Sequence, residues 1–113
     1  MSFFDSEVVR AEMAEISELQ EEVYSSVFEF PRMPVEDQRK HVEIIERLLN
    51  KQQILYTRLS LSDDPQAKVM KKEISKGAVS MGLPHNVDMN IIFNNMNKAL
   101  NLMREHIDKT SST

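Results

Sequence analysis

Several glutamates of this chain stand at the spacing that a divalent-metal site on helices requires. Glu15 and Glu18 are three residues apart in the first part of the 113-residue chain, and Glu43 and Glu46 repeat that spacing further on. Residues three apart lie on the same face of a helix, so each pair points two carboxylates in one direction. Two such pairs that face each other across a helical hairpin offer the oxygen ligands that Mg²⁺ prefers.

This arrangement resembles the metal site of the all-α nucleotide pyrophosphohydrolases of the MazG type. In that family a Glu-x-x-Glu pair on one helix and a Glu-x-x-Asp pair on the next bind the metal, and Glu15–Glu18 has the form of the first pair. Glu43–Glu46 departs from the second, because it ends in glutamate, and Glu-x-x-Asp occurs here only at Glu105–Asp108. Exposed glutamates are ordinary helix formers, so we favour a solvated face and keep the magnesium-dependent enzyme as an alternative.

A basic stripe lies in the second half of the chain. Lys68, Lys72 and Lys76 recur every four residues, with Lys71 beside them. Such a stripe can contact phosphates or an acidic partner, which makes a transcription-linked binder of nucleic acid or polymerase a second alternative. No aromatic residues interleave with the lysines, and the net charge of −4 argues against nucleic acid. We favour a solvated face, or packing against the acidic first helix of the same or another chain.

Asparagines and methionines form two further patterns near the carboxyl end. Asn90, Asn94, Asn97 and Asn101 recur at four-, three- and four-residue steps. Asparagine is a poor helix former, so an uncharged stripe of this kind suits a face that a partner or a second copy partly covers, although a neutral exposed face is commoner. Methionine serves irregular cores or adaptable binding surfaces, and we favour core filling. The clustered methionines are Met70, Met81, Met89, Met96 and Met103.

The chain offers no convincing set of catalytic residues. It has no cysteine, which excludes thiol catalysis and zinc–thiolate sites and fits a reducing cytoplasm. His41, His85 and His106 have no ligand-spaced partner, and no serine stands in a Gly-x-Ser-x-Gly setting. No apolar run approaches the ~20 residues that span a bilayer. We therefore predict a cytoplasmic protein that is not an enzyme, with no cofactor, no metal and no membrane span.

The elements that carry these residues are predicted to be long helices, because the chain has two glycines. An average chain of this length has about eight, and turn-dense β folds and phosphate-binding loops depend on them. Apolar residues at three- and four-residue steps predict a helix from about residue 5 to 28 and another from about 34 to 61. Pro31 and Pro34 separate them, so the span 5–61 reads as an antiparallel hairpin.

Two shorter helices are predicted after the hairpin, at about 65–81 and 87–108, with a frayed tail at 109–113. Asp64 is placed to cap the third helix with Pro65 as its first residue. Gly82 suits a left-handed carboxyl-terminal cap, followed by Leu83 and Pro84. We expect one domain over residues 1–113. Its fold is all-α, a long antiparallel helical hairpin with two shorter helices packed against it in a bundle-like arrangement.

Three segments carry a second resemblance. The segments 2–10, 54–65 and 81–84, with the sequences SFFDSEVVR, ILYTRLSLSDDP and MGLP, are similar to a short all-helical family of unknown function that occurs in cyanobacteria and their phages. The resemblance implies a small helical protein of the cytoplasm, or of the host cytoplasm if it is phage-encoded, and it brings no catalytic residues. Within the central segment, Arg58 and Asp63 have no evident structural role and are candidates for a contact surface.

The function that these patterns favour is a non-enzymatic protein-interaction module, an adaptor or a regulator, with an unidentified protein partner. The apolar face of the second predicted helix is broad, and two short helices leave part of it uncovered. We therefore also predict a homo-oligomer, a dimer or larger.

Overall fold

The chain folds into helices and connecting turns in every part that the computed structural model describes, which is residues 2–80, 82 and 88–111. The four α-helices are α1 (Glu7–Ser26), α2 (Val35–Leu61), α3 (Pro65–Ser80) and α4 (Met89–Ser111), and two short 3₁₀ helices, η1 (Phe3–Asp5) and η2 (Phe30–Arg32), precede α1 and α2. The predicted all-α, bundle-like fold is confirmed. No helix in these ranges combines the length and apolarity that crossing a bilayer requires.

The helix ends follow local signals in the sequence. Ser6 caps α1 by accepting a hydrogen bond from the backbone N–H of Val9, and Pro34 directly precedes α2. Asp64 caps α3 by accepting from the N–H of Gln66 at 2.8 Å. Gly82 has the positive φ of +97° that its predicted cap role requires, while Leu83 and Pro84 lie outside the described residues. Each of these residues satisfies or terminates a helical hydrogen-bond ladder.

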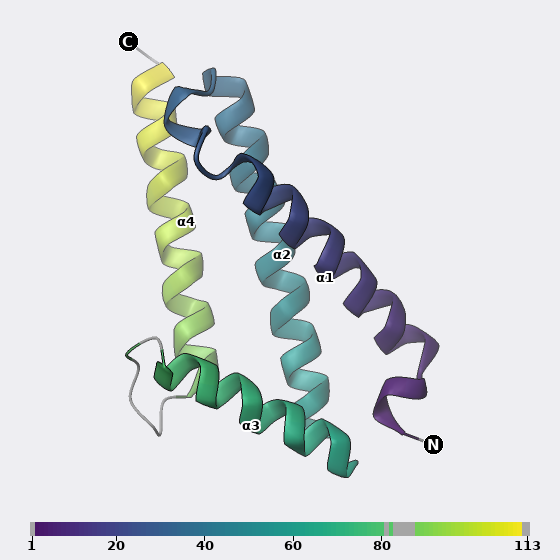
Figure 1. Cartoon of the computed structure of the whole chain (residues 1–113). Helices are drawn as coiled ribbons and strands as arrows, with labels where there is room; N and C mark the ends of the chain where they lie inside the picture. Colours follow the sequence, from purple (N-terminus) through teal and green to yellow (C-terminus); the bar gives the residue numbers. More distant parts are fainter. Residues whose placement is uncertain (1, 81, 83–87, 112–113) are drawn as a thin grey trace.

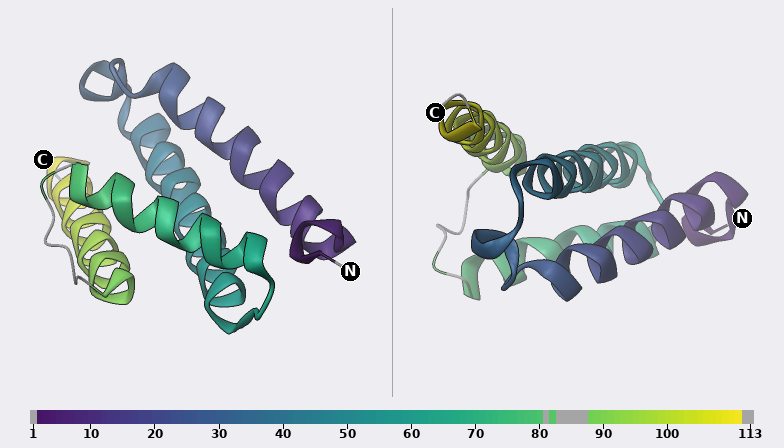
Figure 2. Two further views of the ribbon diagram at one scale, coloured as in Figure 1. Left: turned by 60° about the horizontal axis from the view of Figure 1, so that its bottom comes forward. Right: turned by 90° about the horizontal axis from the view of Figure 1, so that it is seen from above.

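The helix α2 is the centre of the molecule. The helices α1 and α4 pack on different sides of it, and α3 crosses its carboxyl-terminal part (Figure 1). Figure 2 shows two layers, with α2 and α4 in one and α1 and α3 in the other. Both α1 and α4 run antiparallel to α2 (Figure 1). The expected hairpin is therefore present, with α4 as a third long helix beside it.

The prediction that the last two helices are the short ones was wrong for α4. It has 23 residues against 20 in α1, and it continues through Ser111, where a frayed tail was expected after residue 108. The reason is packing: Phe93, Leu100 and Ile107 recur every seven residues and are all buried against α2. This contact extends to Ile107, and the salt bridge between Arg39 and Asp108 at 3.0 Å joins the next residue to α2.

The core is divided between the two sides of α2. One cluster joins α2 to α4 through buried residues, which are Val42, Leu49, Phe93, Leu100 and Ile107. The other joins α2 to α1 through Val9, Ile16 and Leu55. The radius of gyration is 16.3 Å, compared with about 13 Å for a compact chain of this length. The helices thus form an open arrangement in which apolar surface remains exposed.

Candidate functional site

The four glutamates of the alternative metal site, Glu15, Glu18, Glu43 and Glu46, are not brought together. Glu15 is paired with Lys51 across the contact between α1 and α2, and Glu46 is paired with Arg104 across the contact between α2 and α4. Because α1 and α4 lie on different sides of α2, these two carboxylates belong to different faces of the molecule. The hydrogen bond and positive charge of Lys51 lower the pKa of the Glu15 carboxyl.

The other two glutamates, Glu18 and Glu43, are exposed. Among residues 2–80, 82 and 88–111, no group of three or more His, Asp or Glu side chains is close enough to hold a metal ion. Each pair instead contributes one glutamate to an interhelical ion pair. The geometry that a magnesium-dependent pyrophosphohydrolase requires is not present at these positions, so we do not carry that alternative further.

Arg58 has a structural role that its sequence context did not reveal. Its Nε donates a hydrogen bond to Oε1 of Glu12 at 3.1 Å and thereby joins α2 to α1. The expectation that Arg58 is without such a role was wrong, since sequence spacing gives no sign of a contact across 46 residues. Asp63 is exposed in the turn before α3 and stays a predicted contact residue.

The asparagine stripe lies on one flank of α4. Asn90, Asn94 and Asn101 are exposed and Asn97 is half-buried. The side-chain oxygen of Asn101 accepts a hydrogen bond from Arg104 at 3.2 Å. With about 100° between successive residues, this flank is opposite the one that carries Ile92 and Met96. The proposed asparagine and methionine surfaces are therefore two separate faces.

An apolar pocket of about 330 Å³ lies between all four helices. Its described lining is Ile16 and Gln20 of α1, Gln52, Leu55, Tyr56 and Leu59 of α2, Met70 and Ile74 of α3, and Met89, Ile92, Phe93 and Met96 of α4. Its volume falls at the lower end of the range for ligand pockets.

The chemistry of this pocket is that of a binding site for apolar groups. Among its described lining residues, the polar ones are Gln20, Gln52 and Tyr56. The Tyr56 ring lies 6.0 Å from that of Phe93, and the ammonium of Lys71 lies 5.8 Å from the Tyr56 ring centre. The aromatic and aliphatic lining favours apolar groups, and the positive charge of Lys71 beside it would favour those that also carry a negative charge.

Comparison with known proteins gives a match to a protein family. The model of the domain of unknown function DUF1825 matches residues 1–107. The chain belongs to this family. No curated protein and no solved structure matches the chain. Membership confirms the resemblance to a family of unknown function, and the occurrence in cyanobacteria and their phages stays a prediction.

Sequence reasoning singled out the methionines of this DUF1825 member but not the pocket that three of them line. Met70, Met89 and Met96 come from α3 and α4, and Met96 is 49% exposed at the pocket. Met89 and Met103 also pack against the core, which agrees with the core-filling role favoured for the methionines. Met81 lies outside the described residues. Lys71 was noted only as a neighbour of the basic stripe, and Gln20, Gln52 and Tyr56 were missed as site residues, because no sequence spacing shows which helices meet.

Proposed function

We propose that this protein is a non-enzymatic interaction module that binds an amphipathic helix of a partner protein in the pocket between its four helices. The observation that carries this proposal is the pocket itself. It is apolar, it receives side chains from every α-helix, and a half-exposed methionine stands at it. Methionine has an unbranched, polarizable side chain that adapts to differently shaped apolar groups.

A helix fits this site better than an extended segment does. The pocket is surrounded by helices whose backbone groups are already paired, so the N–H and C=O groups of an inserted strand would have no partners there. A helix satisfies its own backbone and inserts only side chains, as in other helix-in-groove complexes. The amides of Gln20 and Gln52 are available to polar atoms at the edge of the pocket.

The position of Lys71 adds a charge preference. Its ammonium lies over the Tyr56 ring, beside the apolar lining. A partner helix that carries an acidic residue next to its apolar face would place a carboxylate close to this cation. An adaptor or regulatory role, as the sequence favoured, is consistent with such selective recognition. The asparagine flank of α4 remains a second, separate candidate surface.

A fluorescent apolar anion, 1-anilinonaphthalene-8-sulfonate, is a direct probe of this pocket. We expect its fluorescence to rise on binding to the wild-type protein, and we expect Met96→Glu to abolish most of the rise, because the new carboxylate lies at the pocket and repels the sulfonate. Leu102→Glu is the matched control, since it places the same charge at another exposed apolar residue of α4 that is not in the described lining of this pocket. Equal probe binding by the two variants would refute the pocket assignment.

The same variants decide whether the pocket binds a protein. A partner captured by the wild type from native cells should be retained by Leu102→Glu, lost by Met96→Glu and displaced by the fluorescent probe. A partner that binds Met96→Glu as well as it binds the wild type would show that recognition takes place elsewhere.

A further inference from the structure

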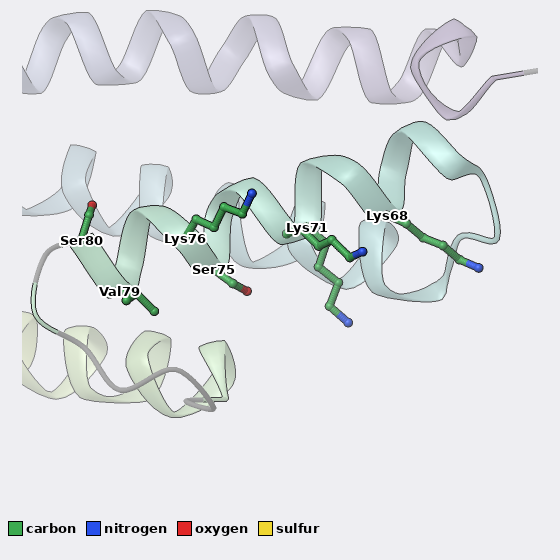
Figure 3. A pocket seen from close by; sticks show the side chains of 7 residues that line it. Lys68, Lys71, Ser75, Lys76, Val79 and Ser80 are labelled. Carbon is green, nitrogen blue, oxygen red and sulfur yellow. The ribbon is translucent and has the colours of Figure 1, made fainter.

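A second surface of the molecule is marked by charge. The helix α3 has four lysines against one glutamate, whereas α1 has six glutamates against one arginine. Lys68, Lys72 and Lys76 are exposed, and in the described part of the chain none of the three is in a salt bridge. The lysines of α3 border an open hollow of about 630 Å³, together with Ser75, Val79 and Ser80 (Figure 3).

The acidic helix carries a face that could complement α3. Glu18 and Glu21 are exposed on the side of α1 that faces away from buried Val9 and Ile16. Within the described ranges neither glutamate is in a salt bridge, unlike Glu12 and Glu15, which are paired with residues of α2. The free charges of α1 and α3 are therefore of opposite sign on surfaces that point away from α2.

The two faces also share one spacing. On α1, Ala14, Glu18, Glu21 and Ser25 follow each other at steps of four, three and four residues. On α3, Lys68, Lys72, Ser75 and Val79 follow the same steps. Each set spans about 16 Å, and this is the spacing of residues that mesh between two packed helices.

Antiparallel pairing of these faces gives matched contacts. Val79 falls opposite Ala14, and Lys72 falls opposite Glu21. Ser75 falls opposite Glu18, which is also within one turn of Lys76. Small and apolar side chains thus meet at one end and opposite charges at the centre.

We propose that two copies of this chain associate by packing α3 of each copy against α1 of the other. A two-fold axis makes this contact twice, so the α1 and α3 faces of both copies are covered and the dimer is closed. The occupant is a second copy because the chain itself supplies the complementary charge and spacing. Nucleic acid fits less well, since the whole chain is acidic with a net charge of −4. This inference does not depend on the pocket proposed above.

The test is a charge swap followed by mass measurement with light scattering. Wild-type protein should have twice the 13.1 kDa chain mass. Lys72→Glu with Lys76→Glu, or Glu18→Lys with Glu21→Lys, should each raise the dimer dissociation constant more than about tenfold. Mixing the two variants should restore a dimer, because each α3 then again meets an α1 of opposite charge.

The control carries Lys40→Glu with Lys98→Glu, the same change in net charge on exposed residues outside α1 and α3. It should remain a dimer, and circular dichroism should show all variants folded, since every altered residue is exposed. A wild-type mass of one chain at all concentrations, variants that stay dimeric, or variants that mixing does not rescue would each overturn the proposal. The proposal would also be overturned if Lys72→Glu with Lys76→Glu abolished binding to a DNA duplex but left the mass measured by light scattering unchanged.

Discussion

Replacement of one buried leucine tests the central position of α2. Leu59 is 1% exposed and borders the interhelical pocket, whereas Leu61, two residues later in the same helix, is 81% exposed. Leu59→Ala leaves a cavity that adjoins the interhelical pocket, so neighbouring side chains have little scope to move in and fill it. Buried Leu→Ala changes cost about 2–5 kcal/mol, and we expect about 3 kcal/mol here.

This cost converts to a large shift in melting temperature. The unfolding entropy of a chain of 113 residues is about 0.24 kcal/mol/K, so a loss of about 3 kcal/mol lowers Tm by about 12 °C. Thermal unfolding followed by far-UV circular dichroism measures the shift. Leu61→Ala is the matched control and should change the stability by no more than about 0.5 kcal/mol. Equal shifts for the two variants would refute the orientation of α2 described above.

Three further predictions concern polar contacts. Asp64 accepts hydrogen bonds from the backbone N–H groups of Phe3 and Gln66, and these bonds lower the pKa of its carboxyl. The ionised carboxylate therefore stabilises the fold above its unfolded pKa, and this stability is lost as the pH falls through the folded pKa. Asp64→Ala removes the bond to the N–H of Phe3 and should speed chymotryptic cleavage near Phe3. Arg58→Met with Glu12→Met should show a coupling of about 0.5–1 kcal/mol in a double-mutant cycle by urea unfolding, and no coupling would count against the ion pair. Burial lowers the pKa of His41, so the folded state disfavours the protonated form of its imidazole. The free energy of unfolding should therefore fall as the pH drops below about 6.5, the ordinary pKa of histidine. His41→Gln should make the free energy of unfolding less dependent on pH in this range.

Local signals predicted the helix ends well. Asp64 and Pro65 mark the start of α3 that the structure shows, because capping depends on groups that are neighbours in sequence. Phe93, Leu100 and Ile107 recur every seven residues in the sequence, which is a helical period, and they form one buried face of α4. The length of α4 was misjudged, because its contact with α2 reaches Ile107 and Asp108, and sequence spacing does not show such a contact.

The candidate site was the part that sequence alone left open. The metal-site reading of the glutamates required Glu15 and Glu46 to share a face, and only the placement of α1 and α4 on different sides of α2 shows that they do not. The role of Arg58 depends on Glu12, 46 residues away.

Glycine scarcity, apolar period and helix caps act between near neighbours, so the order of the amino acids indicates that this chain is helical and where its helices begin. The central place of α2, and the apolar pocket lined by residues of α1, α2, α3 and α4, arise from the packing of helices that are distant in sequence. An apolar stripe specifies which face of a helix is buried, but it does not specify which other helix covers that face.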